Sequence, residues 1–128
     1  FKFTKAIIEN KKLELFNNGK HVRDFTYIDD VTKSILKILN KTPKDKIPYK
    51  IYNIGNNDPV KLMDFIEAIE NALGKKIQKN MMPLQAGDVP ATYANVDDLV
   101  RDLDYKPSTS VQKGIDNFVT WYREFFKV

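Results

Sequence analysis

Two pairs of neighbouring aspartates and a single histidine are the first candidates in this sequence for metal binding or catalysis. Asp29-Asp30 and Asp97-Asp98 each place two carboxylates side by side, an arrangement that suits a divalent cation. Both pairs, however, stand just before an apolar helical repeat, where carboxylates cap backbone amides and favour the helix dipole. His21 lies in a polar turn, which predicts a surface residue. The pattern therefore indicates helix starts and no metal site.

Several kinds of catalytic centre are excluded by what the sequence lacks. Absence of cysteine excludes disulfides, thiolate metal sites and cysteine nucleophiles. There is no Walker loop and no Gly-x-Gly-x-x-Gly or Gly-x-x-Gly-x-x-Gly loop to bring backbone amides against a pyrophosphate. No Tyr precedes a Lys by four residues, the spacing that short-chain reductases need; Tyr93 is followed by Asp97, for example. We therefore expect no catalytic, cofactor-binding or metal-binding residue in this chain.

The composition predicts a folded α/β piece. Hydrophobic residues make up 42% and aromatic residues 12% of the 128 residues, enough for a core. The net charge of +4 comes from basic residues scattered among acidic ones, which is typical of a solvated surface and not of a nucleic-acid groove. No apolar run approaches the roughly 20 residues that span a bilayer, and the lack of cysteine fits the cytoplasm. The chain opens on Phe1 inside a helical pattern, which indicates an internal cut.

Hydrophobic periodicity predicts helices alternating with short strands. Strands are expected at residues 13–16, 23–28, 51–55 and 77–81. Helices are expected over residues 3–8, from 31 to 39, from Asp58-Pro59 to the residue before Gly74, over 96–103 and after Ser110. The result is a small mixed sheet with helices.

Four segments resemble the extended short-chain dehydrogenases/reductases, especially the nucleotide-sugar epimerases. They are RDFTYIDD (23–30), YNIGN (52–56), QAGDVPATYA (85–94) and LDYKP (103–107), and they occur in the family's order and spacing. Within that family the chain is most similar to UDP-glucuronate 4-epimerases and neighbouring bacterial polysaccharide enzymes. Residues 85–90 and the Trp121-Tyr122 pair carry this finer resemblance. Gln85 stands where UDP-glucose 4-epimerases usually have an arginine.

The resemblance implies a role for five side chains. Arg23 matches the arginine that binds the UDP diphosphate, and its planar fork suits bidentate phosphate contact. Asp88 matches the residue that accepts hydrogen bonds from the ribose hydroxyls. Phe16 matches the residue that packs on uracil, Glu14 would offer backbone groups to the uracil edge, and Gln85 would contact nucleotide or sugar. All five would be substrate-binding residues, with no catalytic role.

The resemblance also implies what lies outside this sequence. Residues 1–128 would form the C-terminal nucleotide-sugar-binding domain of a Rossmann-fold enzyme, whose N-terminal domain binds NAD and supplies the catalytic Tyr and Lys. The whole enzyme would oxidise the sugar at C4, return hydride to the opposite face, and form a homodimer mainly through helices of the other domain. The present chain alone would be inactive.

Other interpretations remain open from the residues themselves. A nucleotide-sugar dehydratase or decarboxylase shares these loops, and a stand-alone nucleotide-sugar-binding module would carry the same substrate residues. A plain structural domain is the third alternative. In that case Arg23 pairs with Asp24, Asp88 only forms a turn, and Phe16 belongs to the core.

Overall fold

The computed structural model describes residues 1–44 and 46–128 and divides the chain into two compact units. The first unit consists of residues 1–23, 60–92 and 110–128, and the second of residues 24–59 and 93–109. Both units lie within the range that the resemblance assigns to one substrate-binding domain. Each unit has a core of its own, so the two are described separately.

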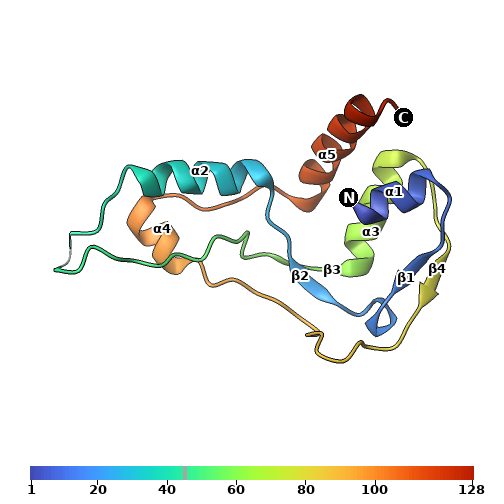
Figure 1. Ribbon diagram of the computed structural model, residues 1–128, viewed down its shortest axis with the longest axis horizontal. Coiled ribbons are helices and arrows are strands. Elements are labelled where there is room, and N and C mark those ends of the chain that lie inside the picture. The colour runs from blue at the N-terminus through green and yellow to red at the C-terminus, as the bar shows by residue number, and fades with distance from the viewer. Residues whose placement is uncertain (45) are drawn as a thin grey trace. The chain divides into compact units, whose positions relative to one another are not determined.

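The first unit packs helices against a pair of short parallel strands (Figure 1). Its helices are α1 (Lys2–Ile8), α3 (Leu62–Leu73) and α5 (Val111–Phe126), and α3 packs against both of the others. Strand β1 (Leu13–Leu15) runs parallel to β4 (Lys79–Met81), with Glu14 opposite Asn80. Ile7, Ile69 and Val119 are buried where the helices meet. The apolar periodicity of these three helices thus forms the core of this unit.

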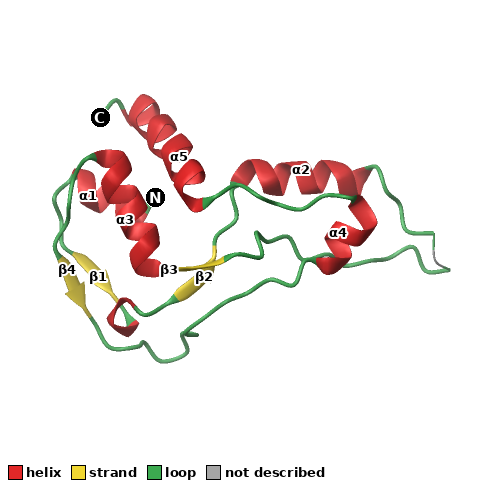
Figure 2. Cartoon of the chain, turned by 180° about the vertical axis from the view of Figure 1, so that it is seen from behind, coloured by secondary structure: helices red, strands yellow, loops and turns green. Residues whose placement is uncertain are grey.

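The second unit contains α2 (Ile28–Leu39) and α4 (Asp97–Leu103), joined by segments without regular structure (Figure 2). Val96, Leu99 and Leu103 are buried at its centre, and Ile38 and Tyr52 pack on them. Strands β2 (Val22–Asp24) and β3 (Pro59–Lys61) form a further two-stranded sheet, most of whose residues belong to the first unit. Along the chain, β2 is followed by α2, which begins at Ile28.

The predicted helix ends agree with the backbone geometry at two places. Helix α3 ends at Gly74, whose φ of 67° is left-handed and costs little without a Cβ. Helix α5 begins after Ser110, whose hydroxyl accepts a hydrogen bond from the Lys113 amide at 3.3 Å. The predicted strands at 13–16 and 77–81 and the helices over 3–8 and 96–103 are also present, with ends shifted by one or two residues.

Two predicted boundaries and one predicted strand are wrong. The strand predicted over 23–28 ends at Asp24, and α2 already begins at Ile28. Asp58-Pro59 does not open a helix, because Pro59 starts β3 and α3 begins only at Leu62. Pro59 is tolerated there because the first residue of an edge strand can lack an amide donor. Residues 51–55 form no strand.

The acidic pairs start helices but do not cap them. Asp30 lies in the first turn of α2, yet its carboxylate accepts hydrogen bonds from the Tyr105 hydroxyl at 2.8 Å and the Thr109 amide at 2.9 Å. At the start of α4, the Asn95 side chain accepts the hydrogen bond from the Asp97 amide. The favourable position near the helix dipole is therefore as predicted, whereas the capping role is not.

Candidate functional site

Arg23 and Asp88, far apart in the sequence, form an ion pair in the first unit. The Arg23 Nη2 donates to Asp88 Oδ1 at 3.0 Å, and Nη1 donates to the carbonyls of Val22 at 2.9 Å and Pro90 at 3.2 Å. Both side chains stay partly accessible, with 25% and 32% of their surface exposed. Arg23 therefore does not pair with its neighbour Asp24. Asp24 instead binds backbone groups, because its Oδ2 accepts hydrogen bonds from the amides of Asn57 and Ala94.

The loop that carries Asp88 is fixed by backbone hydrogen bonds to β2. The Val22 amide donates to the Pro90 carbonyl at 3.0 Å, and the Thr92 amide donates to the Val22 carbonyl at 3.1 Å. Within the loop, the Asp88 amide donates to the Gln85 carbonyl at 3.2 Å, closing a turn in which Gly87 has a φ of 83°. Such a turn favours glycine. The loop thus brings Gln85, Asp88 and Arg23 together, and their roles in substrate binding stay predictions.

His21 belongs to the same site, and its prediction as a surface residue is wrong. Only 5% of the residue is exposed, and its imidazole Nε2 lies 3.0 Å from Asp88 Oδ2. Nε2 nevertheless makes no hydrogen bond with any described residue. Sequence reasoning missed His21 because a polar turn predicts exposure, and its contact with Asp88 joins residues more than 60 positions apart. The sequence did offer one signal. His21 lies two positions before Arg23, and side chains two positions apart in an extended segment point to the same side.

Phe16 and Glu14 lie at β1, further along the same unit. Phe16 is half-buried directly after the strand, and Glu14 is exposed within it. Because β1 and β4 are parallel, their carboxyl ends share an edge, and the amide of Asn18 donates to the Met82 carbonyl there at 2.8 Å. Phe16 therefore lies near the start of the loop that continues to Gln85. We find no hydrogen bond in the described chain that joins Phe16 or Glu14 to Arg23 or Asp88.

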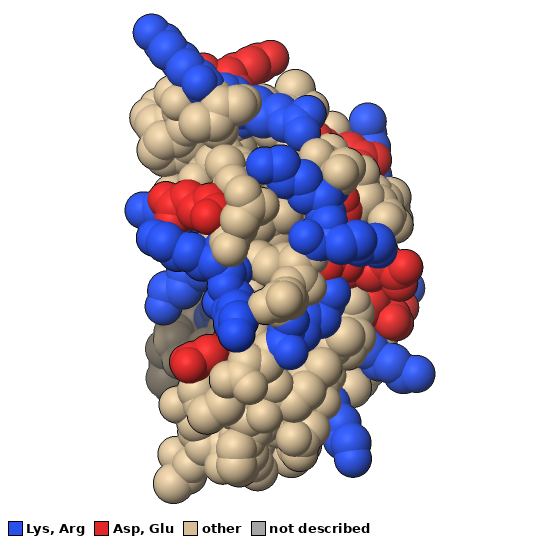
Figure 3. Space-filling model, turned by 90° about the vertical axis from the view of Figure 1, so that its right-hand side faces the viewer, with Lys and Arg blue, Asp and Glu red and all other residues tan. Residues whose placement is uncertain are grey.

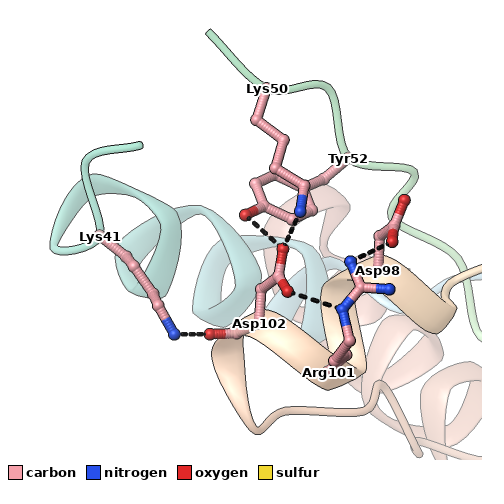
Figure 4. Close-up of polar contacts among 6 residues, drawn as sticks. All are labelled: Lys41, Lys50, Tyr52, Asp98, Arg101 and Asp102. Atoms are coloured by element: carbon pink, nitrogen blue, oxygen red, sulfur yellow. Dashed lines mark hydrogen bonds and ion pairs between the residues drawn. The ribbon is translucent and has the colours of Figure 1, made fainter. Parts of the chain in front are cut away.

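A second polar cluster surrounds Asp102 in the second unit (Figure 4). Its carboxylate pairs with Lys50, accepts from the Tyr52 hydroxyl at 3.0 Å and from Arg101 Nε at 3.0 Å. The Asp102 carbonyl accepts from Lys41. The hydrogen bond from Lys50 and those from Tyr52 and Arg101 lower the pKa of Asp102 to about 2. Three protein donors hold the Asp102 carboxylate, so this cluster links α4 to the segment around Lys50.

The remaining charged side chains of the described residues are mixed in sign. On the face drawn in Figure 3, acidic side chains lie between the basic ones. Among the described residues no cluster of His, Asp or Glu could hold a metal ion, and no helix is long and apolar enough to cross a membrane. In residues 1–44 and 46–128 no strand leads through a glycine-rich turn into a helix.

Comparison with known proteins gives the family. Residues 1–55 match the NAD dependent epimerase/dehydratase family. Across 99% of its length the chain is 51% identical to Protein CapI of Staphylococcus aureus, and likewise 36% identical to the probable UDP-glucuronate 4-epimerase of Rhizobium meliloti (strain 1021). It covers 42% of each relative, less than half of their length.

A solved structure extends the likeness to three dimensions. UDP-glucuronic acid 4-epimerase from Bacillus cereus, crystallised with UDP-glucuronic acid and NAD, aligns with 96% of this chain and 38% of its own, at a TM-score of 0.85 and 28% identity. Sequence and structure agree on the same group of proteins. The chain belongs to the NAD-dependent epimerase/dehydratase family and has the α/β fold of its extended short-chain dehydrogenases/reductases.

Proposed function

We propose that this chain is the UDP-sugar-binding part of an NAD-dependent 4-epimerase whose substrate is UDP-glucuronate. The observation that carries the proposal is the joining of Arg23 and Asp88 in one partly exposed site by the loop that holds Gln85. The names of the similar proteins support the choice of UDP-glucuronate. Residues 1–128 would then act as the substrate-binding domain of a longer enzyme.

The geometry around Arg23 suits an anion that carries two phosphates. Its Nη atoms donate to a carboxylate and to two carbonyls, so the guanidinium is held at the loop without being enclosed. A diphosphate offers stronger charge-assisted hydrogen bonds than a backbone carbonyl does. Arg23 would therefore turn from Asp88 and Pro90 towards the diphosphate when the nucleotide binds.

The other predicted residues would contact the rest of the nucleotide sugar. Asp88 has acceptor positions that the ribose hydroxyls would occupy, and Gln85, exposed at the start of the same turn, would contact nucleotide or sugar through its amide. Phe16 would stack on uracil, and the backbone at Glu14 would pair with the uracil edge. In this arrangement the chain holds the UDP handle and orients the sugar for the reaction.

The redox chemistry belongs to a part of the enzyme that these residues do not form. NAD, bound by a preceding domain, would take up and return the hydride at C4. The present residues would bind and orient the nucleotide sugar, which is a substantial part of catalysis when a reacting carbon must face a cofactor. Homodimer formation and a cytoplasmic location remain predictions from the family resemblance.

A dehydratase or decarboxylase acting on a nucleotide sugar is the second candidate, since the matched family includes dehydratases as well as epimerases. The products separate these reactions. We expect the full-length protein, incubated with NAD and UDP-glucuronate, to give the C4 epimer of the sugar without loss of mass. Release of carbon dioxide with a UDP-pentose, or loss of water, would assign the protein to the other class. Failure to bind any UDP-sugar would favour a structural domain.

A further inference from the structure

His21 presents a buried nitrogen that the structure leaves without a hydrogen bond. Its side chain is 6% exposed, and Nε2 lies 3.0 Å from Asp88 Oδ2 but makes no hydrogen bond with any described residue. A buried donor or acceptor without a partner is costly, so its presence requires an explanation. The backbone around it is well fixed, because the His21 carbonyl accepts from the Leu62 amide at 2.8 Å. A small rotation of Asp88 would therefore complete the contact.

The carboxylate of Asp88 is held on one side only. Oδ1 accepts from Arg23 Nη2 at 3.0 Å and from the Val89 amide at 2.9 Å. Oδ2 faces the imidazole of His21. An ionised carboxylate has about four acceptor positions, so it can hold a protein donor and a ligand hydroxyl together.

Nucleotide binding would disturb this arrangement at a defined point. If Arg23 turns to the diphosphate, Asp88 loses its charge-assisted hydrogen bond just when it has to hold the ribose. His21 is the other side chain within reach of the carboxylate, and imidazole can present an N–H at Nε2 as one neutral tautomer or as the cation.

We propose that His21 is a positioning residue that holds the Asp88 carboxylate for the ribose hydroxyls while Arg23 engages the diphosphate. This inference rests on the proposed function, because it needs the two roles given there to Arg23 and Asp88. It adds a third residue to the nucleotide site, one that acts on the ligand only through Asp88.

Two amide substitutions of His21 separate this role from simple packing. Glutamine carries its amide nitrogen close to the place of Nε2, whereas the amide of asparagine ends about one bond short. Both are polar and uncharged, so their effects on folding should be similar. The ligands are UDP and 2′,3′-dideoxy-UDP, titrated into the full-length protein; the second keeps the diphosphate and uracil but lacks the hydroxyls that Asp88 would bind.

The wild type should prefer UDP over the dideoxy nucleotide. His21→Asn should bind UDP about 10-fold more weakly and the dideoxy nucleotide unchanged, because only one charged hydrogen bond is lost. His21→Gln should keep most of the preference. The inference is overturned if His21→Asn retains the wild-type preference, or if it weakens both nucleotides equally, as a packing defect would. A wild type that binds no UDP would instead overturn the proposed function itself.

Discussion

Arg23 is the side chain on which the proposed site depends most. Its guanidinium is within reach of the Asp88 loop, and it is partly exposed to a ligand. Lys, a point charge on a flexible stem, cannot reproduce the planar fork of Arg at such a place. This difference makes the role of Arg23 testable independently of its charge.

In the full-length protein, Arg23→Ala should weaken UDP binding roughly 10- to 150-fold and leave NAD binding unchanged, because a hydrogen bond to a charged group is worth about 1.5–3 kcal/mol. Arg23→Lys should recover only part of the loss, and Asp88→Asn should cost less than Arg23→Ala, since an amide oxygen still accepts. Parallel calorimetric titrations with UDP and NAD measure both affinities. Arg123→Ala is the matched control, because Arg123 donates to the Leu73 carbonyl away from this loop. Equal weakening of UDP binding and NAD binding would indicate that Arg23 has only a structural role.

Asp30 and Tyr105 form a hydrogen-bonded pair inside the second unit. Burial alone would raise the pKa of Asp30, which is 4% exposed, but hydrogen bonds from Thr109 and Tyr105 outweigh burial and lower it. Burial and the hydrogen bond to Asp30 raise the pKa of Tyr105 to about 12. The pair therefore stabilises the fold only while Asp30 is ionised and Tyr105 is neutral.

Tyr105→Phe should lower the free energy of unfolding by about 1.5–3 kcal/mol at neutral pH, because a buried carboxylate loses a donor. Because the pKa of Asp30 is lowered in the folded protein, this contribution is complete above pH 3.8, the ordinary pKa of an aspartate. It is lost as the pH falls through the lower pKa that Asp30 has in the folded protein. The raised pKa of Tyr105 means that it is complete below pH 10.0 and is lost as the pH rises through about 12. Urea unfolding of both proteins from acid to alkaline pH measures the difference, and a difference independent of pH would contradict the account.

At the scale of elements, the loop from Gln85 to Pro90 holds Asp88 through its turn and its hydrogen bonds to β2. Gly87 and Gly74 both have positive φ, and an added Cβ would meet no atom within 4 Å at either position. The two glycines therefore differ in location and not in local strain, which makes one a control for the other.

Gly87→Ala and Gly74→Ala should each destabilise the protein by about 1 kcal/mol, because alanine is strained at positive φ. Only Gly87→Ala should also weaken UDP binding, since it shifts the turn that carries Asp88. Thermal unfolding measures the first effect and UDP titration the second. A similar loss of UDP affinity in Gly74→Ala would show that general destabilisation, and not the turn, is responsible.

The sequence predicts elements better than it predicts the side chains that join them. Apolar periodicity is a local signal, so helices such as α3 and α5 are visible in it. The carboxylates of Asp24 and Asp30 instead bind backbone amides 33 to 79 residues away, and no local pattern predicts such partners. The family resemblance assigns Arg23 and Asp88 to the same nucleotide, but no pattern in the sequence predicts the ion pair between them. The contact of His21 with Asp88 on the same distant loop is likewise invisible to a local pattern.

At the scale of the molecule, much apolar surface is exposed on both units. Along α2, Ile28 is 63% and Leu39 72% exposed, with Ile35 and Leu36 between them. Trp121 and Phe125 stack on α5 with their ring centroids 5.3 Å apart and remain largely exposed. Surfaces of this kind are usually covered in a native protein.

The 128-residue chain expressed alone should therefore self-associate or unfold readily. Because hydrophobic contacts between copies depend on concentration, its apparent melting temperature should change when the protein is diluted. Thermal unfolding at several concentrations, combined with sedimentation, is the measurement. A highly stable monomer at every concentration would argue for a stand-alone module instead.

The same isolated chain should neither bind NAD nor turn over a nucleotide sugar, because it contains no dinucleotide loop and no Tyr-x-x-x-Lys pair. Calorimetric titration with NAD, with the full-length protein as the positive control, checks this expectation. Micromolar NAD binding to the isolated chain would place the cofactor site within these residues and refute the proposed division of labour.

In the proposed function, Arg23 and Asp88 hold the UDP part of a nucleotide sugar. The crystal structure of the full-length protein with UDP tests it most directly. We expect the Arg23 guanidinium to lie on the diphosphate and the Asp88 carboxylate to lie within hydrogen-bonding distance of the ribose hydroxyls. UDP bound away from the loop between Gln85 and Pro90, with Arg23 still paired to Asp88, would contradict it.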